Sequence, residues 1–132
     1  MYTVGVSDHI MIAHSFADPF FGPGTRMHGA TFTVEIEVRA PELGPHHVVM
    51  DIGALRGMLR RILDALDYRN LDEHPAFSDR TSTTERVAAF IAGLLAKEIC
   101  ALPSDAAPLP GSTLRVFLRE SPAAYASFEQ AL

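Results

Sequence analysis

Residues 31–39 read TFTVEIEVR, and this stretch decides the fold class. Apolar side chains alternate with threonine, glutamate and arginine along its whole length. Such a period of two is typical of a β-strand that turns one face to the core and the other to polar surroundings. Residues 3–16 and residues 112–120 alternate in the same way. We therefore predict that these strands belong to one antiparallel sheet with a single apolar face.

A turn and one more strand are predicted directly after the 31–39 strand. Residues 41–45 read PELGP, and their prolines and glycine disfavour continued strand pairing. Residues 46–52, HHVVMDI, follow this turn. We predict that they form a strand paired with the 31–39 strand as a hairpin with a longer loop.

Two helices are predicted from apolar residues that recur every three or four positions. The first begins after Asp51, and its apolar stripe extends from Leu55 to Leu66. The second is opened by residues 82–85, STTE, a capping box in which the serine hydroxyl accepts from a free backbone N–H. The element order is therefore β-β-β-α-α-β. Two helices can cover only one face of a four-stranded sheet, which defines an α+β fold.

Composition limits the classes of protein to consider. The chain has 132 residues, a formal net charge of −5, no basic run and one cysteine, Cys100. Its length fits a single domain over residues 1–132, because domains usually have about 100–200 residues. The charge disfavours nucleic acid and anionic membranes as partners. The N-terminus lacks the pattern of a secretory signal, and the longest apolar run is about half of the roughly 20 residues that span a bilayer. We expect a cytoplasmic protein.

Three polar residues fall on the apolar side of the predicted sheet, each at the end of a strand. His14, His28 and Glu120 share the phase of the apolar residues of their own strands. If the first two strands are antiparallel neighbours, the end of one meets the start of the other, so His14 and His28 approach each other. Converging neutral imidazoles are a common way to hold zinc. The alternative is that all three are satisfied polar residues at the edge of the core.

Several short motifs together resemble the landmarks of the 6-pyruvoyltetrahydropterin synthase and 6-carboxytetrahydropterin synthase (QueD-type) family, in the family's order and over almost the whole chain. They are IAH at 12–14, MHGATF at 27–32, VVMDI at 48–52, LDYRNL at 66–71, TTE at 83–85, and Glu120. The resemblance implies the tunnelling fold (T-fold), in which four-stranded sheets join in trimers as a β-barrel and can stack into hexamers. It also implies zinc-dependent lyase activity on dihydroneopterin triphosphate.

For the metal, the resemblance implies that His14 and His28 are two of three histidine ligands. The third position holds Ala30, which cannot ligate. A catalytic zinc ion usually has three protein ligands, so zinc is a doubtful cofactor here. Of the other histidines, His74 is the better substitute, although we interpret it as a surface residue. His46 and His47 are predicted to lie too far along the hairpin.

For the chemistry, the resemblance places the family's reactive cysteine at Gly24, next to Thr25. A threonine hydroxyl ionises far less readily than a thiol and needs a strong base. The family's Leu-Asp-His motif matches Asp67, but Tyr68 replaces the histidine. Thr25, Asp67 and Tyr68 are therefore the predicted catalytic positions.

For the substrate, the resemblance implies that Glu120 binds the aminopyrimidine edge of a pterin and that Thr83 and Thr84 wall the pocket. The family's sites lie between subunits, so we expect a homo-trimer or homo-hexamer. Two functions remain open. The first is a pterin-forming lyase with an altered metal set. The second is a catalytically degenerate oligomeric protein that binds a pterin or another heterocycle, or serves only as a scaffold.

Overall fold

Two long strands form the centre of the sheet in the computed structural model, which describes residues 1–132. They are β1 (Tyr2–His14) and β2 (His28–Ala40), paired antiparallel in one continuous register. The register places Ile10 opposite Phe32, and both side chains are fully buried. The period of two therefore builds a core face, as predicted for residues 31–39.

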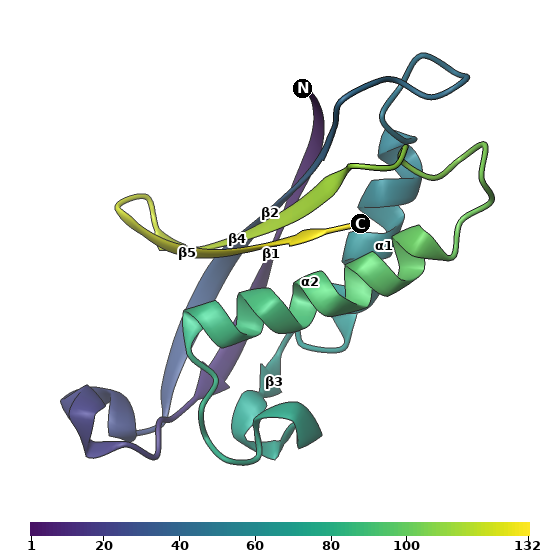
Figure 1. Cartoon of the computed structure of the whole chain (residues 1–132). Helices are drawn as coiled ribbons and strands as arrows, with labels where there is room; N and C mark the ends of the chain where they lie inside the picture. The colour runs from purple at the N-terminus through teal and green to yellow at the C-terminus, as the bar shows by residue number, and fades with distance from the viewer.

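Three further strands complete the sheet (Figure 1). β4 (Thr113–Ser121) pairs antiparallel with β2, and β5 (Ala124–Ala131) pairs antiparallel with β4. The short β3 (Arg69–Asn70) pairs parallel with the outer edge of β1. The strand order is β3-β1-β2-β4-β5. The sheet thus has four long strands and one two-residue strand.

Both helices cover the same face of the sheet (Figure 1). In α1 (Ile52–Asp64) the carboxylate of Asp51 caps the first turn by accepting from the backbone N–H of Ala54 at 2.7 Å. The second helix, α2 (Thr84–Cys100), packs against β4 and β5, and α1 packs against β1. The helices and the sheet share one core of 27 buried residues. Burial of each large aliphatic side chain in such a core contributes about 1.5–3 kcal/mol.

Two sequence predictions about strands are wrong. Residues 46–51 form a loop and Ile52 begins α1, because the chain turns through His47, whose φ is 60°, and the N–H of Gly44 bonds to the carbonyl of Val48. Val49 and Met50 are buried residues of this loop and make no strand pairs. A short apolar run does not distinguish a buried strand from a buried loop. The missed strand, β5, mixes small, aromatic and polar side chains without a regular period of two, so its alternation is weak.

Three 3₁₀ helices occupy loops, and one predicted cap moves by one residue. They are η1 (Pro19–Thr25), η2 (Leu71–Glu73) and η3 (Pro75–Phe77). The N-cap of α2 is Thr83 and not Ser82, because the Thr83 hydroxyl accepts from the backbone N–H of Arg86. Ser82 is instead fully buried. Because Ser82 does not cap α2, its hydroxyl is available to another partner.

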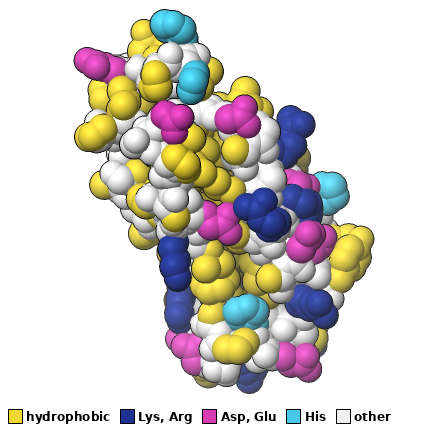
Figure 2. Space-filling model, turned by 90° about the vertical axis from the view of Figure 1, so that its right-hand side faces the viewer, with side chains coloured by type: hydrophobic (Ala, Val, Ile, Leu, Met, Phe, Trp, Pro, Cys, Tyr) yellow, Lys and Arg dark blue, Asp and Glu magenta, His cyan; other side chains and the backbone are white.

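The sheet face opposite the helices carries paired charges. Arg119 forms an ion pair with Glu35 across the strands, and Arg115 lies 4.0 Å from Glu129. The guanidinium of Arg115 also sits over the ring of Phe117, 4.3 Å from its centroid. On the side of the molecule shown in Figure 2, basic side chains lie among aspartates and glutamates, with hydrophobic side chains between them.

Neither α1 nor α2 has the length and apolar character needed to cross a membrane.

Candidate functional site

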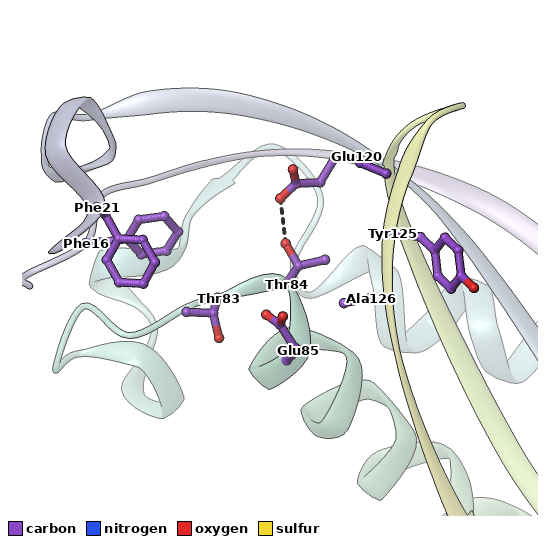
Figure 3. A pocket seen from close by; sticks show the side chains of 9 residues that line it. Phe16, Phe21, Thr83, Thr84, Glu85, Glu120, Tyr125 and Ala126 are labelled. Carbon is purple, nitrogen blue, oxygen red and sulfur yellow. Dashed lines mark hydrogen bonds between the residues drawn. The ribbon is translucent and has the colours of Figure 1, made fainter.

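A pocket of about 430 Å³ lies where three segments distant in sequence meet (Figure 3). The loop between β1 and β2 contributes Phe16 and Phe21, and the start of α2 contributes residues 83–85. The end of β4 and the start of β5 contribute Glu120 and residues 124–126. The structure therefore brings Glu120, Thr83 and Thr84 to one cavity. Their role in substrate binding stays a prediction.

Glu120 is aimed into this pocket by an irregularity of the sheet. The register between β4 and β5 shifts between Arg119 and Ser121, which leaves Glu120 as the extra residue of a β-bulge. Such bulges redirect a side chain away from the regular alternation. One carboxylate oxygen, Oε1, accepts from the Thr84 hydroxyl at 2.5 Å (Figure 3). The other oxygen makes no hydrogen bond within the chain, so it is free to bind a ligand.

His14 and His28 lie beside the pocket, next to Phe16. They face each other in the β1–β2 register with ring centroids 4.6 Å apart. The predicted approach of these two histidines is therefore confirmed. The ring of Phe16, which lines the pocket, packs against His14 at 4.8 Å and lies 5.9 Å from the ring of His28.

Backbone carbonyls set the proton positions on both histidines. Nδ1 of His14 lies 3.1 Å from the carbonyl oxygen of Ser82 and 3.0 Å from its hydroxyl. Nδ1 of His28 lies 2.8 Å from the carbonyl oxygen of Arg26. Because a carbonyl can only accept, we assign the proton to Nδ1 in each ring. Each Nε2 then carries a free lone pair.

The environment of His14 keeps its ring neutral. Only 2% of this residue is exposed. Burial lowers the pKa of His14 below 6.5, and the electrostatic interaction with the neighbouring His28 lowers it further. The hydrogen bond to the Ser82 carbonyl and the charges of Asp72 and Glu120 oppose this shift without reversing it. A neutral His14 is therefore favoured at pH 7.

The donor set falls short of the family's zinc site. The two imidazoles supply two nitrogen ligands, and nowhere in the chain do three His, Cys, Asp or Glu side chains gather as a metal site. His74 does not substitute, because its Nδ1 accepts from the backbone N–H of Ala76 and its ring packs against Phe77 and Phe90. The residues present therefore do not complete a three-ligand site. A metal role for His14 and His28 stays a prediction.

The position of the family's cysteine is occupied by aromatic packing. A Cβ atom added at Gly24 would lie 3.1 Å from a ring carbon of Phe16 and 3.3 Å from the Cβ of Phe21. A side chain at Gly24 would therefore require Phe16 and Phe21 to shift by a few tenths of an ångström. The neighbouring Thr25 donates its hydroxyl hydrogen to the carbonyl of Gly22 at 2.8 Å. No acidic or imidazole group bonds to that hydroxyl, so Thr25 lacks the base that a nucleophile needs.

Asp67 and Tyr68 lie on the outer edge of β1 and do not line the pocket. Asp67 accepts from the backbone N–H of Met11 at 2.9 Å and from Arg60 at 3.2 Å. Tyr68 adopts a φ of 56° and donates its N–H to the carbonyl of Met11, and 79% of the residue is exposed. The single chain therefore does not bring Thr25, Asp67 and Tyr68 into one catalytic group. Their catalytic roles remain predictions.

Sequence reasoning missed the aromatic residues of the site. Phe16 continues the phase of Ile10, Ile12 and His14, and this signal was available. Phe21 lies in η1, where prolines and glycines remove any periodicity. Tyr125 lies in β5, the strand that the sequence did not reveal.

Comparisons with known proteins agree with this architecture. The family model described as 6-pyruvoyl tetrahydropterin synthase matches residues 3–131. The 6-carboxy-5,6,7,8-tetrahydropterin synthase of Bacillus subtilis is 31% identical over 121 residues, covering 89% of this chain and 77% of that protein. The 6-pyruvoyl tetrahydropterin synthase of Caenorhabditis elegans superposes with a TM-score of 0.79 at 24% identity, over 98% of this chain and 96% of that one. The Plasmodium vivax enzyme of the same name gives 0.71 at 17% identity, over the whole of both chains.

The sheet with two helices on one face, and the pocket where strand ends meet the start of α2, define a T-fold protein of the α+β class. More particularly, the match over residues 3–131 shows that the chain belongs to the 6-pyruvoyl tetrahydropterin synthase family.

Proposed function

We propose that the pocket binds a pterin by its aminopyrimidine edge. The observation that carries this proposal is the carboxylate of Glu120, which Thr84 holds through one oxygen while the other oxygen stays free. A carboxylate recognises adjacent N–H groups of a heterocycle through parallel, charge-assisted hydrogen bonds. Membership of a family of pterin synthases supplies the ligand class.

The shape of the pocket supports a flat ring as ligand. Its volume of about 430 Å³ lies within the range of about 300–1,000 Å³ that is usual for small-molecule sites. Phe16 and Phe21 form one wall, with ring centroids 4.5 Å apart. Aromatic side chains favour stacking or edge contacts with a second ring. A bicyclic heterocycle therefore satisfies both the apolar wall and the carboxylate.

The first candidate reaction is the family's lyase reaction on dihydroneopterin triphosphate, giving a 6-pyruvoyl or 6-carboxy product. The carboxylate of Glu120, with one oxygen free, supports the pterin anchoring that this reaction requires. A second candidate is pterin binding without the lyase reaction. Gly24, Ala30 and Tyr68 favour this second candidate, because they replace the thiol, an imidazole ligand and the imidazole of the Asp-His pair that the family resemblance implies.

Assembly into a homo-trimer or homo-hexamer is also part of the proposal. β5 leaves its outer edge unpaired, and β1 is covered by β3 only at Ile12 and Ala13. Unpaired strand edges are sites where another chain adds to a sheet. Mass measurement in solution tests the assembly, and cell fractionation tests the cytoplasmic location expected from the sequence.

Fluorescence titration with neopterin tests the binding proposal. We expect saturable binding by the purified chain and a loss of at least about tenfold in affinity in Glu120→Gln, because a neutral amide loses the charge-assisted bonds. Glu129→Gln is the matched control, since Glu129 pairs with Arg115 outside the pocket. Equal affinity of Glu120→Gln and the native chain would contradict the proposal.

Product chromatography then separates the two candidate reactions. The native chain is incubated with dihydroneopterin triphosphate, with and without added zinc. Formation of a pyruvoyl or carboxy pterin that requires Glu120 supports the lyase. Tight binding of the pterin with no product supports the non-catalytic protein.

A further inference from the structure

One five-residue segment, residues 80–84, bonds to the histidine pair, to the β1–β2 loop and to Glu120. Ser82 bonds to His14, Thr83 caps α2, and Thr84 bonds to Glu120. We infer that Arg80, the first residue of this segment, is a positioning residue that fixes the aromatic wall of the pocket by tying together both ends of the β1–β2 loop. This inference rests on the proposed pterin binding for its effect on affinity.

The guanidinium of Arg80 bridges the two legs of the loop. Its Nη2 donates to the carbonyl of Phe16 at 3.1 Å on the outgoing leg. The same nitrogen donates to the carbonyl of Thr25 at 3.1 Å on the returning leg. Its Nε donates to the hydroxyl of Ser15 at 2.9 Å. One side chain thus holds both ends of the segment that carries Phe16 and Phe21.

A carboxylate completes this arrangement. Asp72 accepts from the hydroxyl of Ser15 at 2.5 Å and from its backbone N–H at 3.0 Å. Asp72 also lies 3.8 Å from the Nε of Arg80. The Ser15 hydroxyl therefore donates to Asp72 and accepts from Arg80, so its orientation is fixed from both sides. Ser15 is 4% exposed, which makes these bonds hard for water to replace.

The backbone of Arg80 is shaped for the same contact. Its φ is 58°, a conformation that residues other than glycine rarely adopt. In this conformation the carbonyl of Arg80 accepts from the N–H of Ala17 at 3.1 Å while the guanidinium reaches the loop. Backbone strain of this kind persists where surrounding contacts impose it. Here the contacts that impose it are those with the loop.

Only arginine has the donors for this task. Its planar guanidinium offers several N–H donors in a fixed fork, whereas lysine offers a single point of charge on a flexible stem. The bonds also bear on His28, because Thr25 precedes Arg26, whose carbonyl holds the Nδ1 of His28. Loss of the bridge would therefore loosen the aromatic wall without removing any residue that lines the pocket.

Two variants of the full chain test the inference. Arg80→Lys keeps the positive charge but not the fork, and Arg80→Gly removes the side chain while accepting a positive φ. Arg61→Lys is the matched control, because Arg61 pairs with Glu98 between the two helices and makes no bond to the loop or to residues 80–84. The measurements are neopterin affinity, thermal midpoint and amide hydrogen exchange of Phe16, whose N–H bonds to the carbonyl of Gly24 at 3.0 Å.

We expect both Arg80 variants to lower neopterin affinity about tenfold and to accelerate exchange at Phe16 by a similar factor, since each loses several charge-assisted bonds. Arg61→Lys should leave both values unchanged at a comparable thermal midpoint. Unchanged exchange at Phe16 would overturn the inference, and so would faster exchange with native affinity. If the native chain binds no neopterin, the proposed function fails, and the exchange measurement alone decides whether Arg80 holds the loop.

Discussion

The two sides of the pocket differ in how far a single chain completes them. The anchor side consists of Glu120 on the β4–β5 bulge and Thr84 at the start of α2, and these residues already bond to each other. The histidine side consists of His14, His28 and the β1–β2 loop, where two imidazoles share a tautomer but no third ligand joins them. Recognition of a ring and chemistry on that ring can therefore be separated in this fold.

The largest expected effect comes from giving the histidine side its missing ligand. In Ala30→His an imidazole is placed two residues after His28, on the same side of β2. We expect zinc affinity to rise at least about a hundredfold, because a third nitrogen completes the usual donor number. Competition with a chromogenic chelator measures this affinity.

Ala30→Gln is the matched control, because it adds a polar side chain of similar length that is a poor zinc ligand. Equal zinc affinity of Ala30→His and Ala30→Gln would show that the two native imidazoles are not arranged for a metal.

On the anchor side, Thr84→Ala should reduce neopterin affinity about tenfold, because the Glu120 carboxylate loses the bond that orients it. Stability should change little. Thr83→Ala provides the contrast, since loss of the α2 cap should lower the free energy of unfolding by about 1 kcal/mol and reduce affinity less than Thr84→Ala does. Titration and urea unfolding distinguish the two variants. Equal effects of both on affinity would contradict a specific role for Thr84.

A comparison of two buried serines sharpens the role of the segment before α2. Ser82→Ala removes the hydroxyl partner of His14, and Ser112→Ala removes a hydroxyl bonded to the carbonyl of Leu109 away from the pocket. Each should lower the free energy of unfolding by about 1 kcal/mol. Only Ser82→Ala should alter the nitrogen resonances of His14. An unchanged His14 spectrum would show that the Ser82 carbonyl alone holds the ring.

The smallest effect concerns pH. Because the pKa of His14 is lowered in the folded chain, the folded state binds fewer protons than the unfolded state just below pH 6.5. The contribution of neutral His14 to the free energy of unfolding is present above pH 6.5. It declines as the pH falls from 6.5 toward the lower pKa of His14 in the folded chain. Urea unfolding between pH 7.5 and pH 5 should show a weaker decline in His14→Gln than in the exposed control His9→Gln. Identical curves for the two variants would contradict the assignment.

Much of the fold follows from the sequence because periodicity is a local property. The alternation of residues 31–39 and the helical spacing after Asp51 predict β2 and α1 with no knowledge of their neighbours. The strand predicted at residues 46–52 was wrong and β5 was missed for the same reason, since a short apolar run and a mixture of small, aromatic and polar side chains carry no distinct period. The ordered motifs predicted the family, which the comparisons show.

By itself, the sequence determined the apolar face of the sheet, the two helices and the strand phase that brings His14 and His28 together, whereas the direction of Glu120 depends on the β4–β5 bulge. Only the tertiary structure decided which groups these residues meet. His14 bonds to a residue 68 positions away and Thr84 to one 36 positions away. Such contacts depend on how helices and strands pack in space, and no local period encodes the partner at the far end of a hydrogen bond.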